Sequence, residues 1–447
     1  MQLTPADARM YWLAGRIRSD QFLLYCFDTS ANDDAALRDA IRGRVERIGD
    51  LRSAVRDVPG HLDHPYWVPR AWSDDLVVVH RLRDRSWPGL QEALGRVVGT
   101  SLDARECTWR LHCYPRVQGA PGCRGDALVV ALQVSHAFAD GRRASALARE
   151  LFAPVVPDVS PPPPEPPPAS LATVRAVLRF PGRFRETIRA GRRAAHANRI
   201  LDEAVSAGEV PPAAPGFALS AVNVPPGPVR EVRSVVRPAR MFRAGGVTVT
   251  VAALTVVSVA LPRLLASLGG TAPARLGAEV TIAVDAAGAR NGYRNAGVDL
   301  FVTEPDLRVR ADRIAVELAA RRARLSHLLS ARRDEVDDHV PAPLAKFGVD
   351  RSDLDVVPAT VTGNTVVTSV ARGRGDLELL GGPAVFSSGF PGLSPVMGLT
   401  HGVYGLGDAV SIGICASPRA VPDVDAYASM LGDALDEVAS ALGSASA

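Results

Sequence analysis

The chain has 447 residues, 47% of them hydrophobic, so it is long enough to form two or three domains that each bury a core. Its formal net charge of +3 gives no global basic field, and the composition therefore does not favour a nucleic-acid partner. Its first residues lack a basic region followed by an apolar core, so we expect a cytoplasmic protein without a secretory signal.

Several common site motifs are missing from the sequence. The five cysteines are odd in number and include no Cys-x-x-Cys pair, which is typical of scattered thiols in a reducing compartment. No Walker-type phosphate loop and no Gly-x-Ser-x-Gly turn occur either. These absences count against NTPase and α/β-hydrolase functions, and we predict neither a metal ion nor a cofactor.

The first 155 residues show the pattern of one α/β domain. Thr4 precedes a Pro-Ala-Asp turn, so a helix is predicted from there to Ala14. Apolar residues recur at helical spacing over Asp33–Ile48, which predicts an amphipathic helix. The other predicted elements are a strand over Phe22–Phe27, extended segments over Tyr66–Val68 and Leu76–Val79, a helix over Leu90–Val98, and a segment Leu102–Leu111 leading into the next strand.

The most informative stretch lies near the end of this domain. Ala127–Val134 is almost wholly apolar, which predicts a strand buried on both faces. His-x-x-x-Asp-Gly follows it, formed by His136, Asp140 and Gly141, and a helix is predicted just past the glycine. The histidine is therefore held at the end of a rigid strand, where catalytic groups are commonly presented.

The spacing alone leaves two interpretations of His136 open. It is either a catalytic base, since its ordinary pKa lies near neutrality, or a partly buried histidine that caps a turn. Asp140 is expected to turn back and salt-bridge an arginine, which would fix the loop. Gly141 is expected to supply a backbone conformation that other residues adopt only with strain.

The composition changes sharply after this domain, and we assign residues 156–214 to a linker. PPPPEPPP within Val156–Ala169 predicts a stiff, exposed spacer. Val174–Arg199 is strongly basic, with eight arginines against Glu186 alone and with apolar residues among them. It is either a helix lying on anionic lipid or a solvated helix packed along the domain junction. We favour the second because Pro181-Gly182 interrupts the segment.

Residues 215–447 are predicted to form a second α/β domain. Its longest apolar run, Val247–Leu261, is expected to be too short to span a bilayer and to belong to a buried core helix that ends at Leu268. The other predicted elements are strands over Val232–Val236, Glu279–Val284, Asn364–Ala371 and Ala409–Cys415, and helices over Asp312–Leu329 and Pro422–Leu442.

Around His136 the chain resembles the bacterial wax ester synthase/diacylglycerol acyltransferase family, whose signature is HHxxxDG. That family belongs to the CoA-dependent acyltransferases that include condensation domains and chloramphenicol acetyltransferase. Other segments follow the family's order: Leu3–Ala8, Pro65–Val68, His80, Pro88-Gly89, Leu102–Trp109, Gly246–Leu254, Thr368–Arg372 and the closing VPDVDAYASMLGDAL. The resemblance implies an α/β fold of two chloramphenicol-acetyltransferase-like domains, joined by a crossover linker, with His136 in a tunnel at their junction.

Three positions depart from the family pattern. Ser135 replaces the first histidine of the signature, Thr250-Val251 replaces an Asn-Asp pair, and Thr368–Gly373 differs from SNVPGP. In this superfamily the second histidine carries the chemistry, and it is retained as His136. The departures therefore bear on the substrate and on the level of activity more than on the fold.

The resemblance also implies roles for individual residues. His136 would take the proton from an acceptor hydroxyl that attacks the thioester of acyl-CoA, and would return it to the departing thiolate. Asp140 would be structural, ion-paired to Arg290 or Arg294 in the DAAGARNGYRNAG loop. The expected supporting residues are Ser135 next to His136 and, as donors to the oxyanion, Thr365, Thr368 or Ser369, although ordinary strand roles remain an equal alternative for these hydroxyls.

We therefore expect an acyl-CoA-dependent O-acyltransferase that uses diacylglycerol or a long-chain alcohol, with acyl-CoA as a substrate rather than a cofactor. Its products would be triacylglycerol or wax ester, and it would contact the inner face of the cell membrane or a lipid droplet. One alternative is an acyltransferase for a secondary-metabolite or sugar hydroxyl. Another is a degenerate paralogue that binds acyl-CoA without turnover, which the altered Ser135 and Thr250-Val251 positions motivate.

Overall fold

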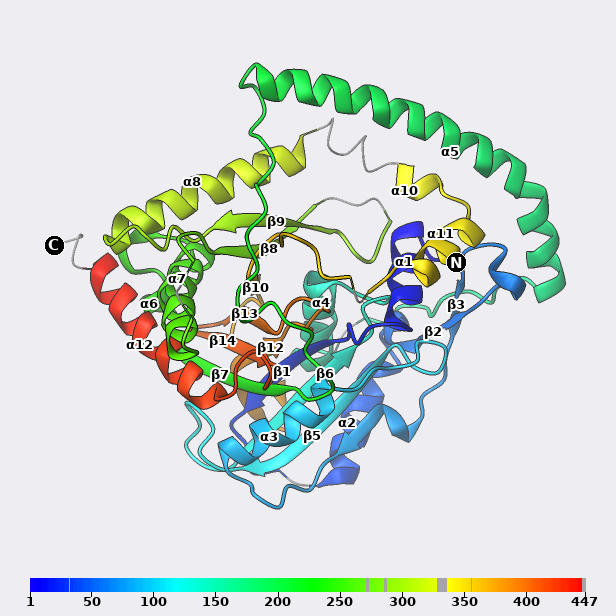
Figure 1. The fold of residues 1–447 in the computed structure, drawn as a ribbon. Coiled ribbons are helices and arrows are strands. Elements are labelled where there is room, and N and C mark those ends of the chain that lie inside the picture. The colour runs from blue at the N-terminus through cyan, green and yellow to red at the C-terminus, as the bar shows by residue number, and fades with distance from the viewer. Residues whose placement is uncertain are drawn as a thin grey trace.

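The structure is a computed structural model that describes residues 1–31, 33–156, 158–270, 273–284, 288–327, 336–354 and 356–443 (Figure 1). The helices are α1 (Pro5–Ala14), α2 (Asp34–Val45), α3 (Trp87–Val98), α4 (Gly141–Phe152), α5 (Ala169–Ser206), α6 (Ala239–Phe242), α7 (Val249–Ser267), α8 (Leu307–Ser326), α10 (Val336–His339), α11 (Ala342–Arg351) and α12 (Val424–Gly443). The strands are β1 (Gln21–Phe27), β2 (Ser53–Arg56), β3 (Tyr66–Pro69), β4 (Val77–Val79), β5 (Trp109–Val117), β6 (Ala127–Val134), β7 (Glu231–Pro238), β8 (Gly277–Ala283), β9 (Tyr293–Asp299), β10 (Thr365–Ala371), β11 (Glu378–Leu379), β12 (Gly382–Phe390), β13 (Leu399–Leu406) and β14 (Ala409–Ala416).

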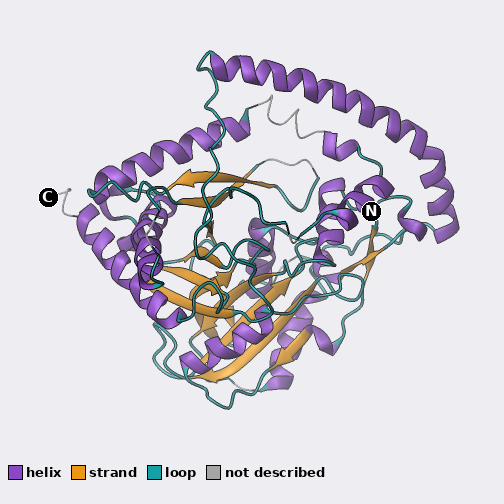
Figure 2. Ribbon diagram, viewed as in Figure 1, coloured by secondary structure: helices purple, strands orange, loops and turns teal. Residues whose placement is uncertain are grey.

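Within these residues the strands form two six-stranded sheets and a two-stranded ribbon of β2 and β3. The first sheet has the order β11-β12-β1-β6-β5-β4, and the second has the order β7-β14-β13-β10-β8-β9. Figure 2 shows that helices cover the outer sides of both sheets. This is the mixed α/β architecture that the sequence predicted.

The first sheet is built around β6, whose eight residues are all buried, as its apolar sequence predicted. On one side β6 pairs with β1, and β1 in turn pairs with β12, so that Phe22 lies opposite both Gln133 and Phe390. Residues 378–390 of the C-terminal half therefore belong to the first sheet. The division predicted at residue 215 does not separate the two sheets, because this later segment crosses back over it.

The second sheet packs against α7, α8 and α12 in a continuous hydrophobic core. Helix α7 has 19 residues and is long and apolar enough to cross a membrane by length and composition, so the expectation that it is too short is wrong. Of its most apolar window, however, 72% is buried inside the protein. The burial agrees with a core helix, which was the predicted role.

Helix α5 differs from its prediction. It runs without a break through Pro181 and Gly182, so the expected interruption is wrong, although the helix curves as it passes along the periphery of the molecule (Figure 1). A proline removes one backbone hydrogen bond and kinks a helix without always ending it. The carbonyl that loses its partner belongs to Val177, and both Val177 and Pro181 are exposed, so this part of the helix faces solvent.

The remaining differences are local. Strands β2, β11, β12 and β13 and helices α6, α10 and α11 were not predicted, and β9 occupies part of the segment that was expected to be a loop. Helix α8 begins earlier than the predicted Asp312, and the last two residues of that prediction lie outside the described residues.

Candidate active site

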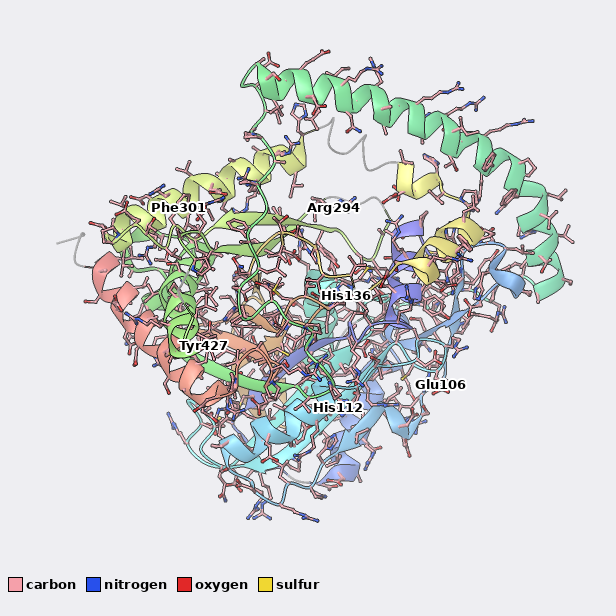
Figure 3. The ribbon with its side chains drawn as sticks, viewed as in Figure 1. Glu106, His112, His136, Arg294, Phe301 and Tyr427 are labelled. Carbon is pink, nitrogen blue, oxygen red and sulfur yellow. The ribbon has the colours of Figure 1, made fainter. Side chains whose placement is uncertain are left out.

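His136 lies two residues beyond the end of β6, in the turn that precedes α4, near the middle of the molecule (Figure 3). The turn ends at Asp140, the N-cap of α4, whose Oδ1 accepts a hydrogen bond from the Arg143 amide at 2.9 Å. Gly141 is the first residue of this helix and does not have a left-handed φ. The strained conformation predicted for Gly141 is therefore wrong, because the position takes ordinary helical geometry.

The side chain of Asn291 fixes which nitrogen of His136 carries the proton. Its Nδ2 donates to the backbone carbonyl of His136 at 2.9 Å and to Oδ1 of Asp7 at 3.0 Å. Both partners only accept, so the amide oxygen of Asn291 must face the ring, where it lies 3.0 Å from Nδ1. Nδ1 of the neutral imidazole is therefore the donor, and Nε2 keeps its lone pair.

Nε2 of His136 lies 3.3 Å from the hydroxyl of Tyr293, which donates toward the lone pair. Burial lowers the pKa of His136 below its ordinary value, and the hydrogen bond to Asn291 partly opposes this. Burial raises the pKa of Tyr293 to about 12. At neutral pH the site thus holds a neutral imidazole beside a protonated phenol, a pair of groups that can accept and donate one proton each.

Two aspartates hold the segment that carries Asn291. Asp7 on α1 is buried and accepts from the Arg290 amide at 3.1 Å as well as from Asn291. Asp140 accepts from the Gly292 amide at 3.0 Å through Oδ2, and its own amide donates to the carbonyl of Arg290 at 3.1 Å. The imidazole is therefore positioned by groups from both halves of the chain.

The ion pair predicted for Asp140 does not form with either candidate arginine. Both carboxylate oxygens of Asp140 already accept from backbone amides. The guanidinium of Arg290 instead pairs with Asp50 at 3.0 Å and lies 4.1 Å from the centre of the Trp67 ring. Arg294 is exposed on β9 rather than in a loop. Asp140 therefore fixes the turn through backbone hydrogen bonds, and Arg290 braces the junction independently.

A cavity of about 580 Å³ opens in front of His136, between the two sheets. Its walls come from α1, β1, the start of α4, and β8, β9 and β10, so it lies at the junction of the two halves. Such a volume is within the range of small-molecule sites. The predicted residues that line it are His136, Asp140, Gly141, Thr368 and Ser369, and its apolar walls include Met10, Leu13, Ile17, Leu23, Leu393 and Met397.

Thr365, the third hydroxyl considered as an oxyanion donor, lies elsewhere. It is fully buried, and its Oγ1 lies 2.9 Å from the Leu399 carbonyl and 3.0 Å from Nδ1 of His401. That role for Thr365 is wrong, because Thr365 does not line the cavity and its hydroxyl is engaged by the Leu399 carbonyl and His401. Thr368 and Ser369 stay as candidates.

Ser135 is directed away from the cavity that holds His136. It lines a second cavity of about 370 Å³ together with residues such as Tyr11, Trp12 and Asp57. Its hydroxyl is buried and hydrogen-bonds to none of the described residues. The position of the family's first histidine is thus on the far side of the turn, which leaves the surroundings of His136 intact. Thr250 and Val251, at the start of α7, line neither cavity.

Charged side chains also line the main cavity, and the sequence did not single them out. Arg372 is only 2% exposed, donates to the Ser388 carbonyl at 2.8 Å, and lies between the rings of Tyr25 and Tyr404, 5.1 and 4.1 Å from their centres. Glu279 on β8 accepts from Asn295 at 2.7 Å, and burial raises its pKa. The cavity is therefore not a purely apolar tunnel.

Replacing Asp140 with alanine should destabilise the protein by about 2 kcal/mol, since the change removes an N-cap and leaves the Gly292 amide without its acceptor. The comparison is Asp306→Ala, which removes the N-cap of α8 but touches no part of the site and should cost about 1 kcal/mol. Urea unfolding of both variants measures the difference. If both variants lose the same free energy of unfolding, the hydrogen bond from the Gly292 amide to Asp140 contributes nothing to stability.

The prediction that His136 is a general base implies that activity persists to a lower pH than an ordinary histidine would allow. A general base must be neutral, and it is neutral above its pKa. Because burial lowers the pKa of His136 from 6.5, the acid limb of the kcat/KM profile should lie below pH 6.5. A limb above that value would contradict the environment described for the imidazole.

Comparison with known proteins supports a family assignment. A family model described as the wax ester synthase/diacylglycerol acyltransferase catalytic domain matches residues 3–255. Two proteins of Mycobacterium tuberculosis strain H37Rv, provisionally named diacylglycerol O-acyltransferases, are 31% identical over 108 residues and 28% identical over 189 residues. The first match covers 23% of this chain and 20% of the relative, and the second covers 40% and 39%. The chain thus matches well under half the length of these relatives.

Solved structures show the same fold over the whole chain. The wax ester synthase/diacylglycerol acyltransferase from Marinobacter aquaeolei VT8 superimposes with a TM-score of 0.64 at 17% identity, covering 99% of this chain and all of that one. The first condensation domain of the calcium-dependent antibiotic synthetase, with a bound substrate analogue, gives 0.58 at 15% identity over 100% and 97% of the two chains. With two chloramphenicol-acetyltransferase-like halves and a matched catalytic-domain model, the chain belongs to the wax ester synthase/diacylglycerol acyltransferase family.

Proposed function

We propose that this protein is an acyl-CoA-dependent O-acyltransferase in which His136 is the general base. The observation that carries the proposal is the state of the imidazole: Asn291 holds the proton on Nδ1, and the lone pair on Nε2 faces a cavity of about 580 Å³. A base needs a neutral nitrogen within hydrogen-bond reach of the proton it takes. A substrate hydroxyl that replaced the weak contact with Tyr293 would occupy that position.

In the proposed reaction Nε2 takes the proton of the acceptor hydroxyl while its oxygen attacks the thioester carbonyl. The tetrahedral intermediate collapses, the carbon–sulfur bond breaks, and the imidazolium returns the proton to the CoA thiolate. The oxyanion needs a donor, and the hydroxyls of Tyr293, Thr368 and Ser369 line the same cavity. Tyr293 suits this role because its raised pKa keeps it protonated.

The acceptor we favour is diacylglycerol or a long-chain alcohol. The family match supports this choice, and so do the apolar walls that Met10, Leu13 and Leu393 contribute. A second candidate is an acceptor that carries a polar or anionic group, such as a sugar or a hydroxy acid. Arg372 and Glu279 favour it, because both line the cavity and their charged groups can form hydrogen bonds or ion pairs with polar groups of an acceptor.

Acceptor profiling tests the proposal. The protein would be incubated with palmitoyl-CoA and, in separate reactions, dioleoylglycerol, hexadecanol, a sugar and a hydroxy acid, with release of CoA thiol and the ester product both recorded. Release of CoA thiol with dioleoylglycerol or hexadecanol supports acyl transfer to a lipid acceptor. Release with the polar acceptors alone moves the assignment to the second candidate, and no release with any acceptor contradicts both.

A further inference from the structure

Helix α5 has two faces of different character. The inner face carries small residues that are buried against the body of the protein: Ala172, Ala176, Ala190, Ala194 and Ala197. Arg183 on the same side pairs with Asp63 at 3.0 Å, and the hydroxyl of Thr187 donates to the His339 carbonyl at 2.7 Å. This face explains how a peripheral helix is attached.

The opposite face carries large apolar side chains that remain exposed to solvent. Leu178 is 75% exposed, Val177 58% and Val174 53%. With three further exposed residues they recur at helical spacing and form what we call the outer stripe: Leu171, Val174, Val177, Leu178, Phe184 and Ile188. A contiguous exposed apolar stripe of this kind marks an interaction surface.

Exposed arginines adjoin the outer stripe along its length. Arg175, Arg179, Arg185 and Arg192 are exposed, and none of them forms a salt bridge to another described residue. Glu186 is the single acidic residue between Ala169 and Leu201. Figure 3 shows side chains with nitrogen-bearing ends projecting outward along this helix. The face is therefore both apolar and strongly positive.

We propose that the outer stripe of α5 binds a membrane surface that carries anionic headgroups. In the plane of such an interface the apolar side chains enter the headgroup region, and the flanking arginines reach the lipid phosphates. A second copy of the chain does not fit this face, because it would bring two rows of arginines together. The sequence left a lipid-bound helix and a packed helix as alternatives, and the two faces of α5 accommodate both.

The proposed surface is connected to the cavity through few elements. Helix α5 packs against α10, α10 contacts α1, and α1 supplies Met10 and Leu13 to the cavity wall. Binding at the stripe would thus hold the cavity close to a lipid surface. The inference does not depend on acyl transfer, since binding is measured without any substrate.

Sedimentation of the full-length protein with vesicles tests the proposal. The protein should bind vesicles of phosphatidylcholine mixed with phosphatidylglycerol and not vesicles of phosphatidylcholine alone. Val174→Glu/Leu178→Glu should lower the partition coefficient roughly tenfold or more, and Arg175→Gln/Arg185→Gln should lower it in a salt-dependent way. The control is Val316→Glu, which makes one such apolar-to-glutamate change at a 71% exposed position on α8 and should bind like the parent protein; Leu178→Glu alone is its single-charge counterpart on α5.

Circular dichroism and thermal midpoints would establish that the substituted helices remain folded. Failure of the parent protein to bind anionic vesicles, equal binding to neutral vesicles, or undiminished binding of Val174→Glu/Leu178→Glu would each overturn the proposal. Size-exclusion chromatography could instead reveal a dimer that Leu178→Glu dissociates. This result would assign the outer stripe to a second copy of the chain and would also overturn the membrane proposal.

Discussion

His136→Ala is expected to lower acceptor-dependent release of CoA from palmitoyl-CoA by at least about a hundredfold, which is the range that general-base catalysis contributes. The variant keeps the backbone hydrogen bond from Asn291 to residue 136 and removes only the ring. Proton transfer from the acceptor hydroxyl then lacks the imidazole nitrogen that would accept the proton. Thiol release with dioleoylglycerol or hexadecanol as acceptor measures the effect.

The control for this experiment is His196→Ala, which removes an exposed histidine on α5 far along the chain from the site. It should keep full activity in the same thiol-release assay. Unchanged activity of His136→Ala would contradict the assignment of His136 as the general base. No acceptor-dependent release from either the parent protein or the variant, combined with retained acyl-CoA affinity, would favour the degenerate binding paralogue.

The elements around His136 were predictable because their signals are local. An eight-residue run that is apolar except for Gln133 specifies β6, and Asp140 followed by helical periodicity specifies the start of α4. The sequence of β12, GPAVFSSGF, contains glycines, serines and a proline, and the strand forms because β1 offers it a partner from far away in the chain. Propensity over a short window cannot indicate such a pairing.

The partners of His136 were missed for the same reason. Asn291 and Tyr293 lie more than 150 residues beyond the motif, and Asp7 lies in the first helix. Nothing in the local sequence of RNGY distinguishes an asparagine that orients a catalytic ring from one in an ordinary turn. The signal that was available, a polar Gly-containing segment after the predicted strand Glu279–Val284, indicated a loop but no particular contact.

The ion pair predicted for Asp140 is replaced by backbone hydrogen bonds. An aspartate in an arginine-rich chain was expected to form an ion pair, and two nearby arginines were named. In the structure its oxygens accept from the amides of Arg143 and Gly292, since a helix N-terminus offers unpaired donors at this position. A capping aspartate thus ties the motif to the second half of the chain without using a cation.

Asn291→Ala should reduce kcat by roughly tenfold to a hundredfold while leaving KM nearly unchanged, because the residue acts through the histidine and not on the substrate. Without the amide oxygen the imidazole loses the acceptor that keeps the proton on Nδ1, so both tautomers and more ring orientations become populated. Asn295→Ala is the matched control. Asn295 lies on β9 and lines the same cavity, but its amide donates to Glu279 and not to His136.

The pH profile separates this positioning role from simple structural damage. The hydrogen bond from Nδ1 to Asn291 favours the charged imidazole and raises the pKa of His136. Its removal should therefore move the acid limb of the profile to a lower pH at the same time as kcat falls. A loss of activity with an unmoved limb and a lowered thermal midpoint would indicate damage to the junction, and an unchanged kcat would remove Asn291 from the mechanism.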